Sequence, residues 1–183
     1  MNEIKILKTT LFCVSMLTLS AVSAQTMSKA DYSATKIRIS ADYKSDKATC
    51  NTLAGNTKDI CVEKAKAKEN VARAELEYGF TGKSADRIKV LKVKAKSVYS
   101  VARERCDDLS GNSKDVCVKE AQAVEKKALA NAKMGQEIDE AVKDAAAEKA
   151  DADYKVAIEK CDALAGDTKS NCIAASKAQF GKS

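Results

Sequence analysis

Cysteine is the only residue type whose number and spacing in this chain point to a defined chemistry. Seven cysteines occur, and six of them form three pairs with ten residues between the partners. This spacing matches neither the short spacing of zinc ligands nor the Cys-x-x-Cys of thiol oxidoreductases. Structural disulfides are the expected use, and soft-metal binding and redox sensing are the alternatives. The six residues are Cys50, Cys61, Cys106, Cys117, Cys161 and Cys172.

The residues that most often perform catalysis are missing or lack a suitable setting. The chain has no histidine, so the commonest general base, metal ligand and pH switch are absent, and a serine or threonine nucleophile has no imidazole to activate it. The 26 acidic residues lie in densely charged segments, where nothing raises a carboxyl pKa as acid catalysis requires. We therefore predict a non-enzymatic protein without catalytic residues, metal or cofactor.

Each cysteine pair belongs to a motif, Cys-x-x-Leu-x-Gly-Asn/Asp-x-Lys-x-x-Cys, that occurs three times at nearly equal intervals. Glycine after the last helical turn can adopt the left-handed conformation that closes a helix, and Asn or Asp is a preferred residue for starting the next one. The motif therefore predicts a corner between two helices. The residues concerned are Gly55 and Asn56, Gly111 and Asn112, and Gly166 and Asp167.

The corner determines which cysteines can bond. On one continuous helix the two cysteines of a motif would lie ~16 Å apart, whereas a disulfide needs Cα atoms within about 7 Å. A reversal at the glycine brings them together. Because the spacing is the same in all three copies, we predict bonds joining Cys50 to Cys61, Cys106 to Cys117 and Cys161 to Cys172. Each should contribute about 3 kcal/mol to stability.

The composition and the spacing of apolar residues predict an all-α fold. Aromatic residues make up 4% of the chain, and proline and tryptophan are absent. We expect about six helices in three antiparallel, coiled-coil-like hairpins, each clamped by a local disulfide. A lone glycine at Gly135 costs only ~1 kcal/mol, so the fourth and fifth helices could be continuous. The expected helices cover 28–54, 57–78, 84–110, 113–133, 137–165 and 168–180, and the three repeats cover 25–82, 83–135 and 136–183.

The N-terminal segment, 1–24, has the pattern of a secretory signal peptide. Lys5 and Lys8 precede an apolar run over 9–19, and Val22-Ser23-Ala24 provides a small-residue cleavage site. A membrane anchor is the competing interpretation, but it needs ~20 apolar residues. We predict export to the periplasm or the medium after cleavage near Ala24, with no integral membrane segment in the mature chain.

The charges are unevenly distributed along a chain whose net charge is +6. The segment 87–103 has no acidic residue, whereas 137–153 carries seven acids against two lysines. We expect these two segments to lie against each other. The alternative is a free basic face that binds anionic lipid headgroups, acidic envelope polymers or nucleic acid, the last without specificity. The candidate anion-binding residues are Arg87, Lys89, Lys92, Lys94, Lys96 and Arg103.

The three motifs and the terminal Phe180-Gly-Lys-Ser183 resemble a group of exported, Ala/Lys/Glu-rich three-repeat proteins of proteobacteria. Some of these are labelled as similar to the cell-envelope protein TolA. Neither the C-terminal recognition domain of TolA nor its transmembrane anchor has a counterpart in this chain. The resemblance therefore implies an envelope setting and assigns no functional residue.

Together these observations predict a non-enzymatic periplasmic helical protein with a structural or interaction role in the cell envelope. Its partner would be an envelope protein or an anionic polymer, and self-association is compatible with the pattern. The alternatives are a binding module that holds an anionic ligand through 87–103 and a periplasmic stress chaperone.

Overall fold

The computed structural model describes residues 27–182, which form helices joined by short turns and contain no strand, so the predicted all-α class is confirmed. The predicted signal peptide, 1–24, lies outside the described residues. The helices are α1 (Lys29–Cys50), α2 (Gly55–Thr81), α3 (Ser84–Cys106), α4 (Gly111–Asp162) and α5 (Gly166–Gln179).

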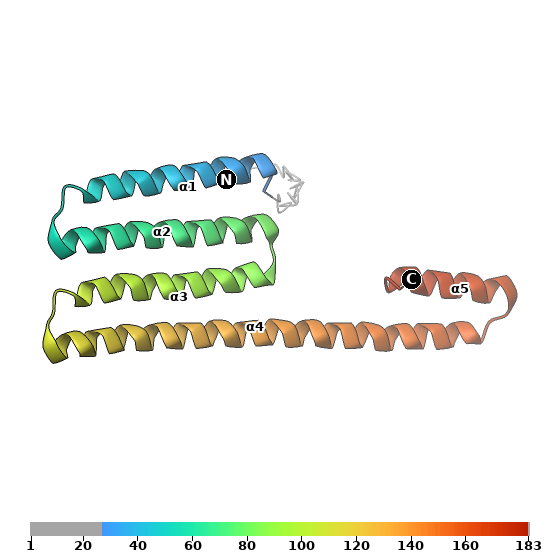
Figure 1. Cartoon of the computed structure of the whole chain (residues 1–183). Coiled ribbons are helices and arrows are strands. Elements are labelled where there is room, and N and C mark those ends of the chain that lie inside the picture. Colours follow the sequence, from blue (N-terminus) through green and yellow to red (C-terminus); the bar gives the residue numbers. More distant parts are fainter. Residues whose placement is uncertain (1–26, 183) are drawn as a thin grey trace, which may run out of the picture.

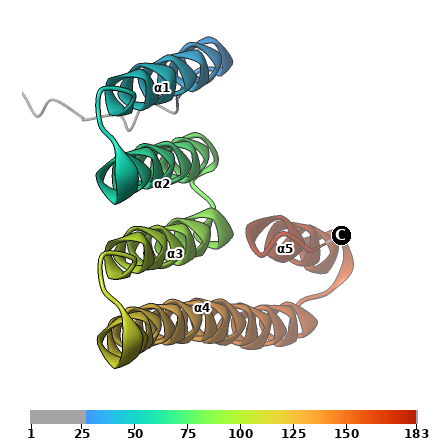
Figure 2. The same cartoon turned by 60° about the vertical axis from the view of Figure 1, so that its left-hand side comes forward.

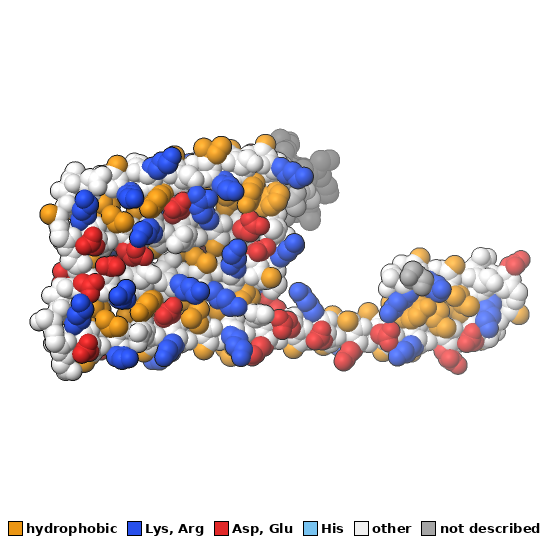
Figure 3. Space-filling view, viewed as in Figure 1, with side chains coloured by type: hydrophobic (Ala, Val, Ile, Leu, Met, Phe, Trp, Pro, Cys, Tyr) orange, Lys and Arg blue, Asp and Glu red, His pale blue; other side chains and the backbone are white. Residues whose placement is uncertain are grey.

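The helices form an open layer and not a closed bundle. α1, α2, α3 and the first half of α4 lie side by side, in the same order in both views (Figures 1 and 2). Within 27–182, each helix contacts only the helices next to it in the chain. The second half of α4 projects beyond α3, and α5 folds back over its far end (Figure 1). Acidic side chains gather along the projecting part, between the layer and α5 (Figure 3).

The core is thin because small side chains make most of the contacts between helices. The fully buried side chains of largest volume are three half-cystines, Cys50, Cys106 and Cys161. Alanine lets two helices approach closely but removes little apolar surface from water. A protein packed in this way depends on covalent braces more than one with a thick core does. The buried alanines are Ala65, Ala74, Ala95, Ala121 and Ala132, and the larger buried aliphatic side chains are Ile39, Leu76, Ile88 and Val90.

The structure has five described helices where about six were predicted, because 113–133 and 137–165 belong to the single 52-residue helix α4, the continuity that the sequence analysis left open. Gly135 keeps a helical conformation, which costs only ~1 kcal/mol, and a Cβ atom there would lie 3.7 Å from Cδ1 of Ile88, an ordinary contact. The break after α2 differs because Gly82 is left-handed, with φ +62°, and donates its N–H to the Tyr78 carbonyl at 2.8 Å. The sequence around Gly135 has no second glycine that could adopt the left-handed conformation and end the helix there.

The corners are also built differently from the prediction. α1 and α3 end at Cys50 and Cys106, four residues earlier than expected, and Gly55 begins the next helix with φ +54°. The N–H of Leu53 donates to the Cys50 carbonyl at 3.1 Å, which tightens the helix end into a turn. Asn56 does not cap α2; its Nδ2 donates to the Glu104 carbonyl of α3 at 2.9 Å. The amide therefore joins two repeats.

Candidate functional site

The six cysteines form three disulfides, one at each corner. The Cα atoms of Cys50 and Cys61 are 5.6 Å apart, those of Cys106 and Cys117 5.7 Å, and those of Cys161 and Cys172 5.6 Å. These separations lie within the usual range for disulfides. Each bond connects the end of one helix to the second turn of the next.

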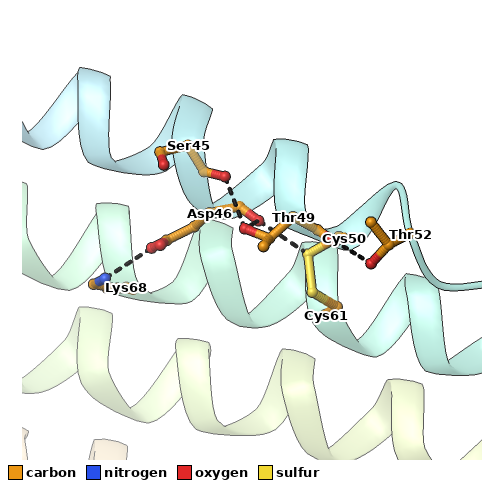
Figure 4. Close-up of a disulfide and its surroundings, with 7 residues drawn as sticks. All are labelled: Ser45, Asp46, Thr49, Cys50, Thr52, Cys61 and Lys68. Carbon is orange, nitrogen blue, oxygen red and sulfur yellow. Dashed lines mark hydrogen bonds and ion pairs between the residues drawn. A yellow bond between two sulfur atoms is a disulfide. The ribbon is translucent and has the colours of Figure 1, made fainter.

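Polar contacts complete the first corner (Figure 4). Nζ of Lys68 on α2 lies 2.8 Å from the carboxylate of Asp46 on α1, one turn before the disulfide, and this hydrogen bond raises the pKa of Lys68. The hydroxyl of Thr49 donates to the Ser45 carbonyl at 2.9 Å. Cys50 has no exposed surface. The disulfide is therefore buried on the Cys50 side, whereas Cys61 is half-buried and lines an open groove.

The six basic residues of the candidate anion site are not brought together on one free face. Arg87 lies 2.5 Å from Asp139 of α4, and Nζ of Lys94 lies 2.7 Å from Glu75 of α2. Lys92 donates to the side-chain oxygen of Gln136 at 3.2 Å. Lys89 and Lys96 line a groove that also contains acidic side chains, and Arg103 is exposed.

The expected pairing of segment 87–103 with segment 137–153 is wrong for most of its length. Between these two described segments, only the Arg87–Asp139 contact forms an ion pair. Because α4 continues straight through Gly135, the acidic segment extends past the first residue of α3 and does not turn back along it. Residues 140–150 are all exposed. Beyond them, Asp151 pairs with Lys155 at 2.9 Å and with Lys182 at 3.1 Å, and these hydrogen bonds lower its pKa.

An open groove between α2 and α3 combines positive charge with an apolar floor. We call it the basic groove. Its volume is about 590 Å³, and no acidic residue lines it. Val98, which is 56% exposed, is the most accessible large apolar side chain of the floor. Its rim consists of Lys64, Lys68, Lys94 and Arg105, and its floor of Ala67, Val71, Ser97, Val98, Val101 and Ala102.

The basic groove has the chemistry to hold an amphipathic anion. Four cations can surround an acidic headgroup, and the valines offer apolar contact to a hydrocarbon chain. Two rim lysines already have carboxylate neighbours outside the groove, since Lys68 pairs with Asp46 and Lys94 with Glu75. Lys64 and Arg105 have no ion pair in the described part of the chain, which leaves them available to a ligand.

Only Lys94 of the six predicted residues lines the basic groove. The analysis of 87–103 missed Lys64 and Lys68 because they lie on α2, in the repeat before. Their spacing of four residues on one helix face was a usable signal. Nothing in the sequence, however, indicated that this face turns toward the end of α3, where Arg105 lies.

A second groove, of about 400 Å³, lies between α1, α2 and α3, and Tyr32, Arg73 and Glu77 on its wall belong to a polar network. The hydroxyl of Tyr32 donates to Glu77 at 2.6 Å, and Arg73 donates to Glu69 at 2.7 Å and to Ser40 at 2.8 Å. The hydrogen bond to Glu77 raises the pKa of Tyr32. The bonds from Tyr32 to Glu77 and from Arg73 to Ser40 link α1 to α2.

The described residues contain no group of three or more His, Cys, Asp or Glu side chains placed to hold a metal ion. None of the described helices is long and apolar enough to span a membrane. No family of known proteins, no curated protein and no solved structure matches the chain.

Proposed function

We propose that this protein is a non-enzymatic helical interaction protein that works in the periplasm or another compartment outside the cytoplasm. The observation that supports it is the open layer: each described helix contacts only its neighbours in the chain, so long helix faces stay accessible. Proteins built from stacked helical repeats use such extended faces to bind partners.

The disulfides support the proposed location outside the cytoplasm. Structural disulfides persist in the periplasm and in secreted proteins and are rare where thiols are kept reduced. Each of the three closes a short segment between two helices whose packing relies on alanine. In this proposal every repeat is an antiparallel hairpin clamped by its own disulfide. The predicted signal peptide and the resemblance to exported envelope proteins agree with this setting.

Cell fractionation combined with peptide mapping tests the compartment. Expressed in a proteobacterium, the chain should appear in the osmotic-shock fraction, shortened at Ala24, with no free thiol. Non-reducing digests should contain peptides joined through 50–61, 106–117 and 161–172. A chain that stays in the cytoplasm with reduced thiols, or a bond between different repeats, would overturn the proposal.

The basic groove supports a second candidate function, the binding of an acidic amphipath such as a fatty acid. The specific observation is the all-cationic rim around an apolar floor. The oxidised protein should bind a fluorescent long-chain fatty acid, and a neutral detergent of equal chain length should compete poorly. Charge reversal by Lys64→Glu with Arg105→Glu should weaken binding at least tenfold, because two attractions become repulsions.

The matched control reverses two lysines of α1, Lys29→Glu with Lys44→Glu, which gives the same change in net charge away from the groove. Equal loss in both variants would mean that only the overall charge matters. Salt screens contacts between exposed charges, so binding that survives high salt must depend on apolar contacts. If the protein binds unfolded proteins and this binding survives high salt, the periplasmic chaperone becomes the favoured function.

A further inference from the structure

One side of α4 is free of the other described helices over its whole length. α3 covers the first half of α4 and α5 its far end, and both lie on the same side of it in the two views (Figures 1 and 2). Among the described residues, no helix other than these two contacts α4. The bare side of this 52-residue helix is about 78 Å long, at 1.5 Å per residue.

Apolar side chains follow this bare side with the spacing of a coiled-coil seam. We call them the outer stripe. Together with four charged residues they recur at intervals of three or four positions, and all of them are exposed. Met134 and Ile138 at its centre are each 55% exposed. The outer stripe consists of Val116, Ala123, Ala130, Met134, Ile138, Ala141, Ala145, Ala152 and Val156, and the charged seam positions are Glu120, Lys127, Glu148 and Glu159.

The internal repeat shows how such a face is covered elsewhere in the same chain. α2 and α3 belong to consecutive repeats and pack against each other. When the repeats are aligned on their cysteines, Ala67 of α2, which lines the groove with α3, corresponds to Ala123. In the same alignment Val101 of α3 corresponds to Val156. The first half of the outer stripe is thus equivalent to the face of α2 that meets α3, and its second half to the face of α3 that meets α2.

Within one chain these two halves cannot meet. α2 and α3 are joined at Gly82 and Lys83, where the chain reverses. The equivalent position in α4 is Ile138: it aligns with Gly82 when residues are counted forward from Cys117, and with Lys83 when they are counted back from Cys161. At Ile138, however, α4 continues as a straight helix. A second copy related by a two-fold axis beside Ile138 would bring the first half of one α4 against the second half of the other. We propose that the outer stripe is a homodimer interface in which two α4 helices pack antiparallel about this axis.

One pair of seam charges, Lys127 and Glu148, is complementary in this register. Layers pair Met134 with Ala141 of the second copy, Ala130 with Ala145, and Lys127 with Glu148. Neither Lys127 nor Glu148 has an ion pair within the described part of one chain. The two halves of α4 also differ in sign, because 114–133 has five lysines against three acids whereas 137–153 has seven acids against two lysines. Antiparallel packing places these halves opposite each other, whereas parallel packing would oppose like charges.

The seam is long enough for a stable dimer. From Val116 to Glu159 it spans about 65 Å. With a contact about 10 Å wide, it buries on the order of 1,300 Å² in total, within the range of specific interfaces. The other helices do not obstruct it, since α3 and α5 lie on the opposite side of α4 (Figure 2).

Sedimentation equilibrium of the exported, oxidised protein tests the proposal. The wild-type protein should sediment with twice the mass of a single chain at micromolar concentration. Ile138→Asp should raise the dissociation constant by about 100-fold, because it removes two apolar contacts at the axis and places two carboxylates side by side. Circular dichroism should show unchanged helicity, since Ile138 is exposed in the single chain. The matched control is Ile37→Asp on α1, 71% exposed, which should leave the mass unchanged.

Charge exchange tests the antiparallel register. Lys127→Glu or Glu148→Lys alone should each raise the dissociation constant of the dimer about tenfold. The Lys127–Glu148 pair occurs twice in a two-fold symmetric dimer, so one substitution breaks both ion pairs. The double variant should regain the wild-type dissociation constant, since the pair forms again with reversed polarity. A monomeric wild-type protein, a dimer unaffected by Ile138→Asp, or a double variant weaker than both single ones would overturn the proposal.

Discussion

Arg87 of α3 lies 2.5 Å from Asp139 of α4, and the hydroxyl of Ser84 donates to the same carboxylate. This contact joins the first turn of α3 to α4 at the point where α4 leaves the helical layer. Residues 140–150 beyond it are exposed on all sides. The ion pair therefore marks the boundary between the packed part of α4 and its projecting part.

The hydrogen bonds from Ser84 and Arg87 lower the pKa of Asp139, which makes stability depend on pH in a defined direction. A carboxyl group whose pKa is lower in the folded state stabilises the fold above its unfolded pKa and loses this effect as the pH falls through the folded value. Asp139→Asn should therefore lower Tm at neutral pH and have a progressively smaller effect as the pH falls below about 3.9, the usual pKa of Asp. Thermal melts of both proteins across this pH range measure the difference.

Asp144→Asn is the control for this measurement, because Asp144 is exposed and has no ion pair with a described residue. Its Tm should follow that of the wild-type protein at every pH. An equal fall in Tm for the two variants would show that the net charge of the acidic segment, and not the contact with Arg87, controls the pH dependence.

Gly82 and Gly79 should respond in opposite ways to the same substitution. Gly82→Ala places a Cβ on a residue with φ +62° and should destabilise the protein by about 1–2 kcal/mol. Gly79 is helical, and a Cβ there would meet only the end of Met27 at 3.8 Å, so Gly79→Ala should stabilise by about 0.5–1 kcal/mol. Denaturant unfolding distinguishes the two. Destabilisation by both variants would contradict the assignment of the helix end to Gly82.

Ala132 is 1% exposed, which indicates that its small size sets the distance between α3 and α4. Ala132→Leu should destabilise the protein by about 1–3 kcal/mol, because added methyl groups force the helices apart. Ala147→Leu is the matched control on the exposed segment of the same helix and should change stability by less than about 0.5 kcal/mol. A neutral Ala132→Leu would mean that the two helices separate easily.

The sequence predicted the features that depend on a local residue pattern, such as the all-α class and the corners. It did not predict the features that depend on a balance of small energies or on packing between helices. Helical composition and the repeated corner motif were sufficient for the all-α class. The continuity of α4 at Gly135 was not decided, because one glycine costs about as much as a few favourable contacts contribute. That single choice moved the acidic segment away from α3. The basic groove was missed for a related reason: Lys64 and Arg105 come from different repeats, and their proximity depends on how α2 packs on α3.

The three disulfides should differ in what they stabilise. α5 has only 14 residues and contacts no described helix except α4, whereas α3 and α4 share a long packed face. Isolated helices of this length are marginal in water. Without the bond from Cys161 to Cys172, α5 relies on few contacts, which include the packing of Tyr154 on Phe180, with ring centroids 5.9 Å apart. Each bond contributes about 3 kcal/mol in the chain-entropy account.

Replacing Cys161 and Cys172 together by alanine should therefore unfold α5 locally while the layer of α1 to α4 keeps its structure. Hydrogen exchange should lose protection over Gly166–Gln179 and stay unchanged in α2 and α3. Replacing Cys106 and Cys117 by alanine is the matched control: it should lower the free energy of unfolding by about 3 kcal/mol but leave α3 protected, because α2 and α4 hold it on both sides. If the first variant instead loses protection throughout the chain, α5 and the layer unfold as one cooperative unit, and the separation of the two along α4 is wrong.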